Sequence, residues 1–276
     1  MATEKERPVS SSVPPDFPRE QRALFCEVLH HMNGVGVPYV VSGAFALQKH
    51  TGIWRDTKDL DLFLPAEAVP QALRYLQEQG FETEICDPVW LAKAHRNGYY
   101  VDLITGMSNA VITVDLSWID RASCTVILGV PVRVLAAEEL IASKLFVNFR
   151  ERFDGADIVH IIYGTRGKLD WQRLRQLIGE HWELLLWELV LYRYVYPAYQ
   201  HYVPSEVWND LLSRLRRELE SPSANSPFRG SLVDDRMFAI DVKEWGLENL
   251  LEERRSQHGS RIAAGAALPL VGTEEA

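Results

Sequence analysis

The most constraining feature of this sequence is a pair of aspartates two residues apart in an apolar run. Asp59 and Asp61 flank Leu60, and Leu62 and Phe63 follow. In a β-strand, residues i and i+2 share a face, so the two carboxylates would project from one side of a sheet. A divalent cation such as Mg²⁺, which prefers oxygen ligands, would remove their repulsion. The run therefore predicts a strand with a cation site; the alternative is a solvent-facing pair on an edge strand.

A glycine turn precedes the pair. Residues 38–41 predict a short strand, Ser42 and Gly43 a turn, and residues 44–50 a helix. The first backbone N–H groups of a helix have no partner within the helix and favour an anion such as phosphate. Ser42, Gly43 and Ala44 are therefore candidate phosphate-binding residues.

The glycine turn followed by the aspartate pair resembles the nucleotidyltransferase superfamily that includes DNA polymerase beta. Ala44 stands where that family usually has glycine or serine. Family members carry a third carboxylate on a later strand, for which Asp102 is the best match and Asp115 the rival. The resemblance implies that Asp59, Asp61 and Asp102 are catalytic residues. It also implies that they bind Mg²⁺, two ions in all, with a nucleoside triphosphate such as ATP as substrate.

A second stretch extends the resemblance. The apolar helix predicted over 138–146, which contains Lys144, and the segment 150–158 are similar to small bacterial members such as the AbiEii-type toxins. In those relatives the basic residue lies near the nucleotide phosphates, and a point charge suits a triphosphate. The alternative is that Lys144 is a solvated helix charge paired with Glu138 or Glu139.

Four residues near these motifs have candidate roles as well. Arg55 and Thr57 lie just before the aspartate pair and are expected to reach the nucleotide, although Thr57 alternatively stabilises the turn into the strand. Asp154 precedes a glycine and is expected to cap the next helix. Asp157 is expected to pair with Arg150 or Arg152.

Composition limits the class of partner. The net charge of −9 and pI near 5.4 argue against a protein that grips nucleic acid non-specifically, because that requires a basic surface. Three widely spaced cysteines predict reduced thiols and a cytoplasmic location. The first residues lack an apolar signal segment, and no apolar run is long enough to predict a membrane partner.

The order of the predicted elements indicates an α/β (α+β) fold. A small mixed sheet with flanking helices would carry the acidic site, and a helical C-terminal half would follow. We expect a disordered arm over 1–17, a nucleotidyltransferase-like domain over 18–165, a helical domain over 166–250 and a disordered tail over 251–276.

The resemblance implies a metal-dependent enzyme that moves a nucleoside monophosphate to a hydroxyl acceptor. A tRNA or other RNA end would make it toxin-like, with an antitoxin protein as partner. A small molecule is the alternative acceptor, because residues 66–104 are similar to aminoglycoside nucleotidyltransferases. A non-catalytic member that binds a nucleotide or a partner protein is the third possibility.

Overall fold

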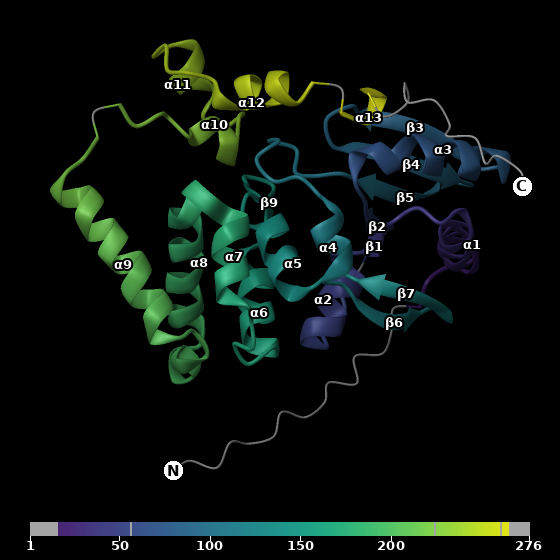
Figure 1. The fold of residues 1–276 in the computed structure, drawn as a ribbon, viewed down its shortest axis with the longest axis horizontal. Coiled ribbons are helices and arrows are strands. Elements are labelled where there is room, and N and C mark those ends of the chain that lie inside the picture. The colour runs from purple at the N-terminus through teal and green to yellow at the C-terminus, as the bar shows by residue number, and fades with distance from the viewer. Residues whose placement is uncertain (1–15, 56, 224, 260, 265–276) are drawn as a thin grey trace, which may run out of the picture. The chain divides into compact units, whose positions relative to one another are not determined.

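The structure is a computed structural model (Figure 1). It describes residues 16–55, 57–223, 225–259 and 261–264. Most of the expected N-terminal arm and the last residues of the expected tail lie outside the described residues.

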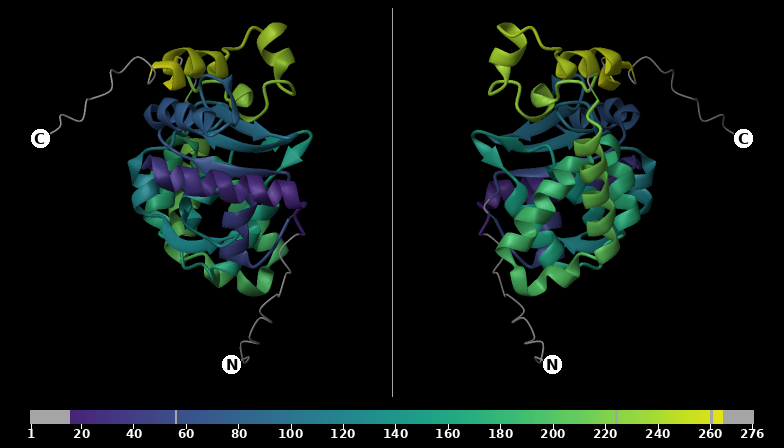
Figure 2. Two further views of the ribbon diagram at one scale, coloured as in Figure 1. Left: turned by 90° about the vertical axis from the view of Figure 1, so that its right-hand side faces the viewer. Right: turned by 90° about the vertical axis from the view of Figure 1, so that its left-hand side faces the viewer.

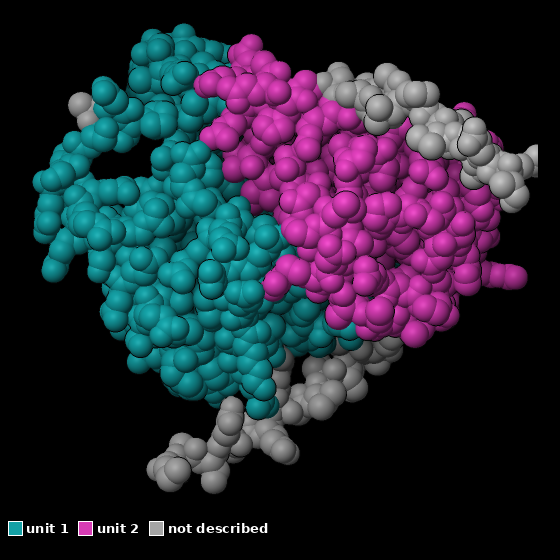
Figure 3. All heavy atoms as spheres, in the orientation of Figure 1, with its two compact units in different colours: residues 1–17, 42–57, 134–251 teal, residues 18–41, 58–133, 252–276 magenta. Residues whose placement is uncertain are grey.

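Contacts divide the chain into two compact units, each drawn from separate segments (Figure 3). We call them the sheet unit (Pro18–Val41, Lys58–Arg133 and Glu252–Ala276) and the helical unit (Met1–Phe17, Ser42–Thr57 and Val134–Leu251). A domain boundary near residue 165 stays a prediction.

The sheet unit is built on a seven-stranded mixed sheet in the order β3-β4-β5-β2-β1-β7-β6. β2 and β5 are parallel, whereas β1–β2, β3–β4 and β4–β5 are antiparallel pairs. The strands are β1 (Val40–Val41), β2 (Asp59–Phe63), β3 (Glu82–Asp87), β4 (Leu91–Arg96), β5 (Tyr99–Ile104), β6 (Ser123–Ile127) and β7 (Val130–Val134). The mixed sheet and the helices after it confirm the predicted fold class.

Two tight hairpins shape this sheet. Asn97 and Gly98 join β4 to β5, and Leu128 and Gly129 join β6 to β7; all four residues have positive φ. Two-residue hairpin loops with positive φ at both positions match the twist of the flanking strands, and Asn-Gly is a preferred pair there. β4 was not predicted, because its alanines and lysine have low strand propensity.

α1 and α3 cover one face of the sheet, and the acids lie on the other. α1 contacts β5 and α3, and α3 contacts β3 and β4 (Figure 2). The helices in the first two segments of the sheet unit are α1 (Arg19–Val35), η1 (Ala66–Ala68), α3 (Val69–Glu78) and α4 (Leu116–Asp120). The central strand residues facing α1 and α3 are fully buried: Leu60, Leu62, Val101 and Leu103. Because strand side chains alternate, the aspartates between them project from the opposite face.

The expected disordered tail is partly helical. α12 (Leu250–His258) and α13 (Arg261–Ala264) form there. The Arg255 guanidinium makes a two-pronged contact with the Asp87 carboxylate, and the backbone N–H of buried Ile262 donates to the Pro88 carbonyl. The expectation was therefore wrong for these residues, since it missed contacts with a distant part of the sequence.

The helical unit surrounds a core of aromatic and aliphatic side chains. α2 packs against α5 and α6, and α6 packs against α8. Its elements are α2 (Gly43–Thr51), α5 (Ala137–Lys144), β8 (Asn148–Phe149), β9 (Arg152–Phe153), α6 (Gly155–Gly164), α7 (Trp171–Ile178), η2 (Gly179–His181), α8 (Trp182–Val195), η3 (Pro197–Tyr202), α9 (Ser205–Glu220), α10 (Gly230–Val233) and α11 (Ala239–Lys243). Among the described residues, no helix is long and apolar enough to span a membrane.

Candidate active site

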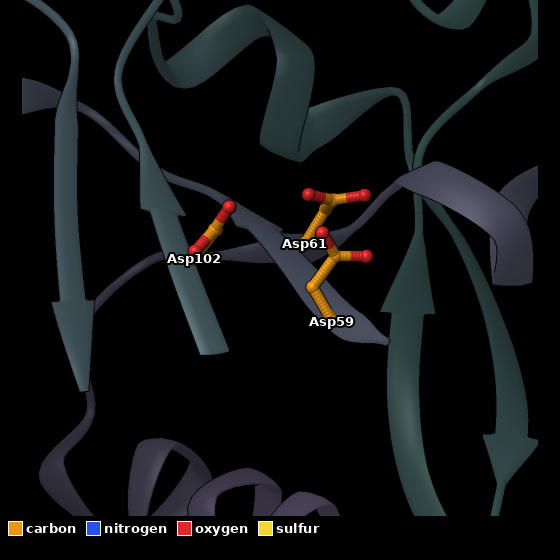
Figure 4. Close-up of side chains that lie close together, drawn as sticks. All are labelled: Asp59, Asp61 and Asp102. Carbon is orange, nitrogen blue, oxygen red and sulfur yellow. The ribbon is translucent and has the colours of Figure 1, made fainter. Parts of the chain in front are cut away.

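Three carboxylates meet on the face of the central strands that lies opposite α1 and α3. β2 carries Asp59 and Asp61, and the parallel neighbour β5 carries Asp102 directly opposite Asp61. One oxygen from each lies within 4.8 Å of the others (Figure 4). All three residues are half-buried. The structure thus brings together the three acids that the sequence analysis selected.

The rival third acid lies elsewhere. Asp115 is the N-cap residue of α4, and its carboxylate accepts hydrogen bonds from the Ser117 N–H and hydroxyl groups. It is not a member of the acidic cluster. Its local role is helix capping, a common use of aspartate at this position.

Lys93 on β4 contacts the cluster. It lies directly opposite Asp102, and its Nζ donates to Asp102 Oδ1 at 2.8 Å. The same ammonium sits 4.1 Å from the centre of the Tyr100 ring. Burial raises the pKa of the Asp102 carboxyl more than the Lys93 contact lowers it, and the nearby charge of Asp59 adds to the increase. Lys93 was not predicted as a site residue because β4 was not predicted, although the Asn97-Gly98 hairpin signal was present in the sequence.

The donor set fits a divalent cation such as Mg²⁺. It consists only of carboxylate oxygens held on two hydrogen-bonded strands, and hard cations prefer oxygen ligands. The Lys93 contact uses one oxygen of Asp102, and a carboxylate has a second oxygen with which to bind an ion. A bound cation would also reduce the repulsion among the three carboxylates.

The predicted glycine turn is present in the helical unit. Gly43 begins α2 with a φ of 56°, a left-handed conformation that glycine adopts without steric cost. Ser42 is buried and its carbonyl accepts from the Ala46 N–H, while Ala44 is half-buried in the first turn. An α-helix starting after such a turn presents N–H groups suited to an anion.

Lys144 lies in a buried ionic network of the helical unit. Its Nζ lies 2.7 Å from Asp154 and 2.9 Å from Asp157, and all three side chains are almost fully buried. Arg152 also pairs with Asp154, and Arg55 with Asp157. Burial alone would raise the pKa of the Asp154 carboxyl, but the contacts with Arg152 and Lys144 outweigh burial and lower it.

Two expectations for this region need correction. Asp157 pairs with Lys144 and Arg55, whereas the sequence predicted Arg150 or Arg152 as its partner. Lys144 is not solvated, because α5 is buried along its whole length. Its partners are Asp154 and Asp157 and not Glu138 or Glu139. Glu139 pairs instead with Arg173, and Glu138 accepts from the Asp170 N–H group. The end of a buried helix favours internal ion pairs over solvated charges.

A hollow of about 580 Å³ also lies in the sheet unit, and none of the three clustered acids lines it. It is bordered by the end of α1, by α4 and by the β6–β7 hairpin. Asn33, Tyr39 and Arg133 supply polar groups to it. None of the predicted site residues lines this hollow.

A comparison with protein families identifies the class. The family described as "Nucleotidyl transferase of unknown function (DUF2204)" matches residues 21–184. The match spans more than half of the chain, from α1 into α8, and includes the glycine turn and all three acids. The chain therefore belongs to this nucleotidyltransferase family.

Several solved structures resemble the chain weakly. ANT(2'')-Ia in complex with adenylyl-2''-tobramycin is 18% identical, covering 64% of this chain and 99% of its own, with a TM-score of 0.37. The lincosamide antibiotic adenylyltransferase LnuA is 16% identical, covering 52% and 96%, with a TM-score of 0.37. An antigenic nucleotidyltransferase-like protein from Paracoccidioides brasiliensis is 18% identical, covering 67% and 93%, with a TM-score of 0.41. The comparison with curated proteins found no match, and the assignment rests on the family match.

Proposed function

We propose that this protein transfers a nucleoside monophosphate from a nucleoside triphosphate to a hydroxyl group, with Mg²⁺ held by Asp59, Asp61 and Asp102. The observation that carries the proposal is the convergence of these carboxylates to within 4.8 Å on adjacent strands. Membership of a nucleotidyltransferase family supports the same reaction class.

The acids have distinct proposed tasks. Bound Mg²⁺ ions, two in this proposal, would lower the pKa of the acceptor hydroxyl and balance the charge of the triphosphate and the departing pyrophosphate. Asp59 and Asp61 would hold the ions from β2, and Asp102 would hold them from β5. The pairing of these two strands fixes the spacing of the three carboxylates. Asp102 is also proposed to accept the proton of the acceptor hydroxyl.

Residues of the helical unit are proposed to hold the nucleotide. The backbone at Ser42, Gly43 and Ala44 offers N–H groups to the phosphates. Arg55 and Thr57 contribute side-chain donors, and the Arg55 side chain is 45% exposed even while it pairs with Asp157.

Lys144 is proposed to act indirectly. Its ammonium is engaged by Asp154 and Asp157, and Asp157 in turn holds Arg55. Lys144 thus fixes the Asp157 carboxylate, which in turn orients Arg55 toward the triphosphate. The positive charge of Lys144 supports triphosphate binding through this carboxylate.

The acceptor is proposed to be a hydroxyl recognised at a local site. The net charge of −9 supports this, because binding along an extended nucleic acid needs a basic surface. An RNA end would support a toxin-like role with an antitoxin partner. A small-molecule hydroxyl would support a modifying enzyme.

A labelled-nucleotide assay tests the proposal. The full chain and the Asp59→Asn variant are each incubated with one α-labelled nucleoside triphosphate, Mg²⁺ and either total cellular RNA or a protein-free small-molecule extract. We expect label to enter one acceptor fraction with the wild type only. Equal labelling by the folded Asp59→Asn variant, or no labelling with any nucleotide in either fraction, would contradict the proposal.

A further inference from the structure

A row of charged residues crosses four neighbouring strands on the acidic face. The registers pair Glu84 with Lys93, Lys93 with Asp102, and Asp102 with Asp61. Residues that are direct cross-strand partners lie on the same face of a sheet. Lys93 is therefore the cation in a row that otherwise carries carboxylates.

Lys93 is held in place by two contacts. Its Nζ donates to Asp102 Oδ1 at 2.8 Å and lies over the Tyr100 ring at 4.1 Å. Its side chain is only 23% exposed. An ammonium clamped between a carboxylate and an aromatic ring loses much of the freedom of a surface lysine. It acts as a fixed positive charge beside the cluster.

This fixed charge changes what the cluster can bind. The three carboxylates of the cluster carry a charge of −3 when ionised, and Lys93 reduces the sum over these four side chains to −2, which one divalent cation balances. Glu84, the exposed partner of Lys93 on β3, is not a member of the cluster. Lys93 also occupies one oxygen of Asp102, so that residue has one oxygen left for an ion. A second divalent cation would meet net repulsion until a polyanion supplied further negative charge.

We propose that Lys93 is a built-in counter-cation that limits the acidic cluster to one divalent cation, so that a second cation enters only together with the nucleoside triphosphate. The inference rests on the proposed function, because it assumes that the cluster binds cations. It makes Lys93 a positioning residue that acts through Asp102.

Calorimetric titration of the full chain with Mn²⁺, without nucleotide, tests this role. The wild type should bind one ion per chain. Lys93→Met keeps the length of the side chain but removes its charge, and it should bind the first ion at least about tenfold more tightly, equivalent to about 1.4 kcal/mol, or bind two ions. Lys93→Arg should behave as the wild type.

Arg74→Met is the matched control. Arg74 is exposed on α3, which packs on the opposite face of the same sheet, and its loss changes the net charge by the same amount. This variant should bind Mn²⁺ as the wild type does. Near-UV circular dichroism checks that every variant is folded.

The outcomes separate the two levels of the proposal. The role of Lys93 would be overturned if the wild type binds one ion, Asp61→Asn loses that ion, and Lys93→Met binds it with unchanged or weaker affinity. The proposed metal site would still stand in that case. Two ions in the nucleotide-free wild type would overturn it as well. No binding in the wild type, or unchanged binding in Asp61→Asn, would overturn the proposed metal site itself.

Discussion

Glu188 gives the sharpest prediction about stability. It lies on α8, is 1% exposed, and neither of its carboxylate oxygens has a hydrogen-bond partner among the described residues. It approaches the start of α6 so closely that a Cβ added at Gly155 would lie 2.8 Å from its Oε2. Burial raises the pKa of Glu188 from 4.5 to about 7.

The sign of the pH dependence follows from this shift. Between pH 4.5 and 7 the unfolded chain releases the proton of Glu188 while the folded chain retains it. The folded state then binds more protons than the unfolded state, so the free energy of unfolding falls as pH rises through this window. At 1.36 kcal/mol per pKa unit, the loss contributed by Glu188 is about 3 kcal/mol by pH 8.

Urea unfolding of wild type and Glu188→Gln at pH 5 and pH 8 measures this effect. Glutamine cannot ionise, so the stability of the variant relative to the wild type should improve by about 2.5 kcal/mol from pH 5 to pH 8, because part of the loss has already occurred at pH 5. The control Glu218→Gln, exposed on α9, should show no such change. If Glu188→Gln and wild type keep a constant difference from pH 5 to pH 8, the reasoning is refuted.

Two further substitutions test buried features of the helical unit. Lys144→Met leaves Asp154 and Asp157 without their shared ammonium and should lower the free energy of unfolding by about 3 kcal/mol; an unchanged urea midpoint would contradict the network. Gly167→Ala should cost at least about 2 kcal/mol, measured by thermal unfolding. Gly167 has a φ of 68°, and the added Cβ would lie 1.8 Å from the Tyr202 carbonyl oxygen. A melting temperature of Gly167→Ala equal to that of the wild type would exclude this close approach.

The local parts of the site were predictable from the sequence. Alternation in a strand places Asp59 and Asp61 on one face, whatever the strand packs against. The turn at Gly43 follows from the need for a positive φ between a strand and a helix. Both features depend on residues that are neighbours in the chain.

The non-local parts were not predictable to the same degree. The choice between Asp102 and Asp115 depends on which strand pairs with β2, and Lys93 joins the cluster only because β4 pairs with β5. The partners of Lys144 likewise come from the segment after its own helix. Such pairings are decided by contacts between residues that are distant in the sequence, and the secondary-structure propensity of a single segment does not encode them.

The most direct test of the acidic centre compares the two rival third acids. Asp102→Asn and Asp115→Asn are made in the full chain, checked for folding, and assayed for Mg²⁺-dependent transfer of labelled nucleotide. Loss of an acid that binds the catalytic ions should lower the initial rate at least about 100-fold in Asp102→Asn. Asp115→Asn should stay close to the wild-type rate, because asparagine also caps helices. A wild-type rate in folded Asp102→Asn, or a comparable loss in Asp115→Asn, would contradict the assignment of the centre to Asp59, Asp61 and Asp102.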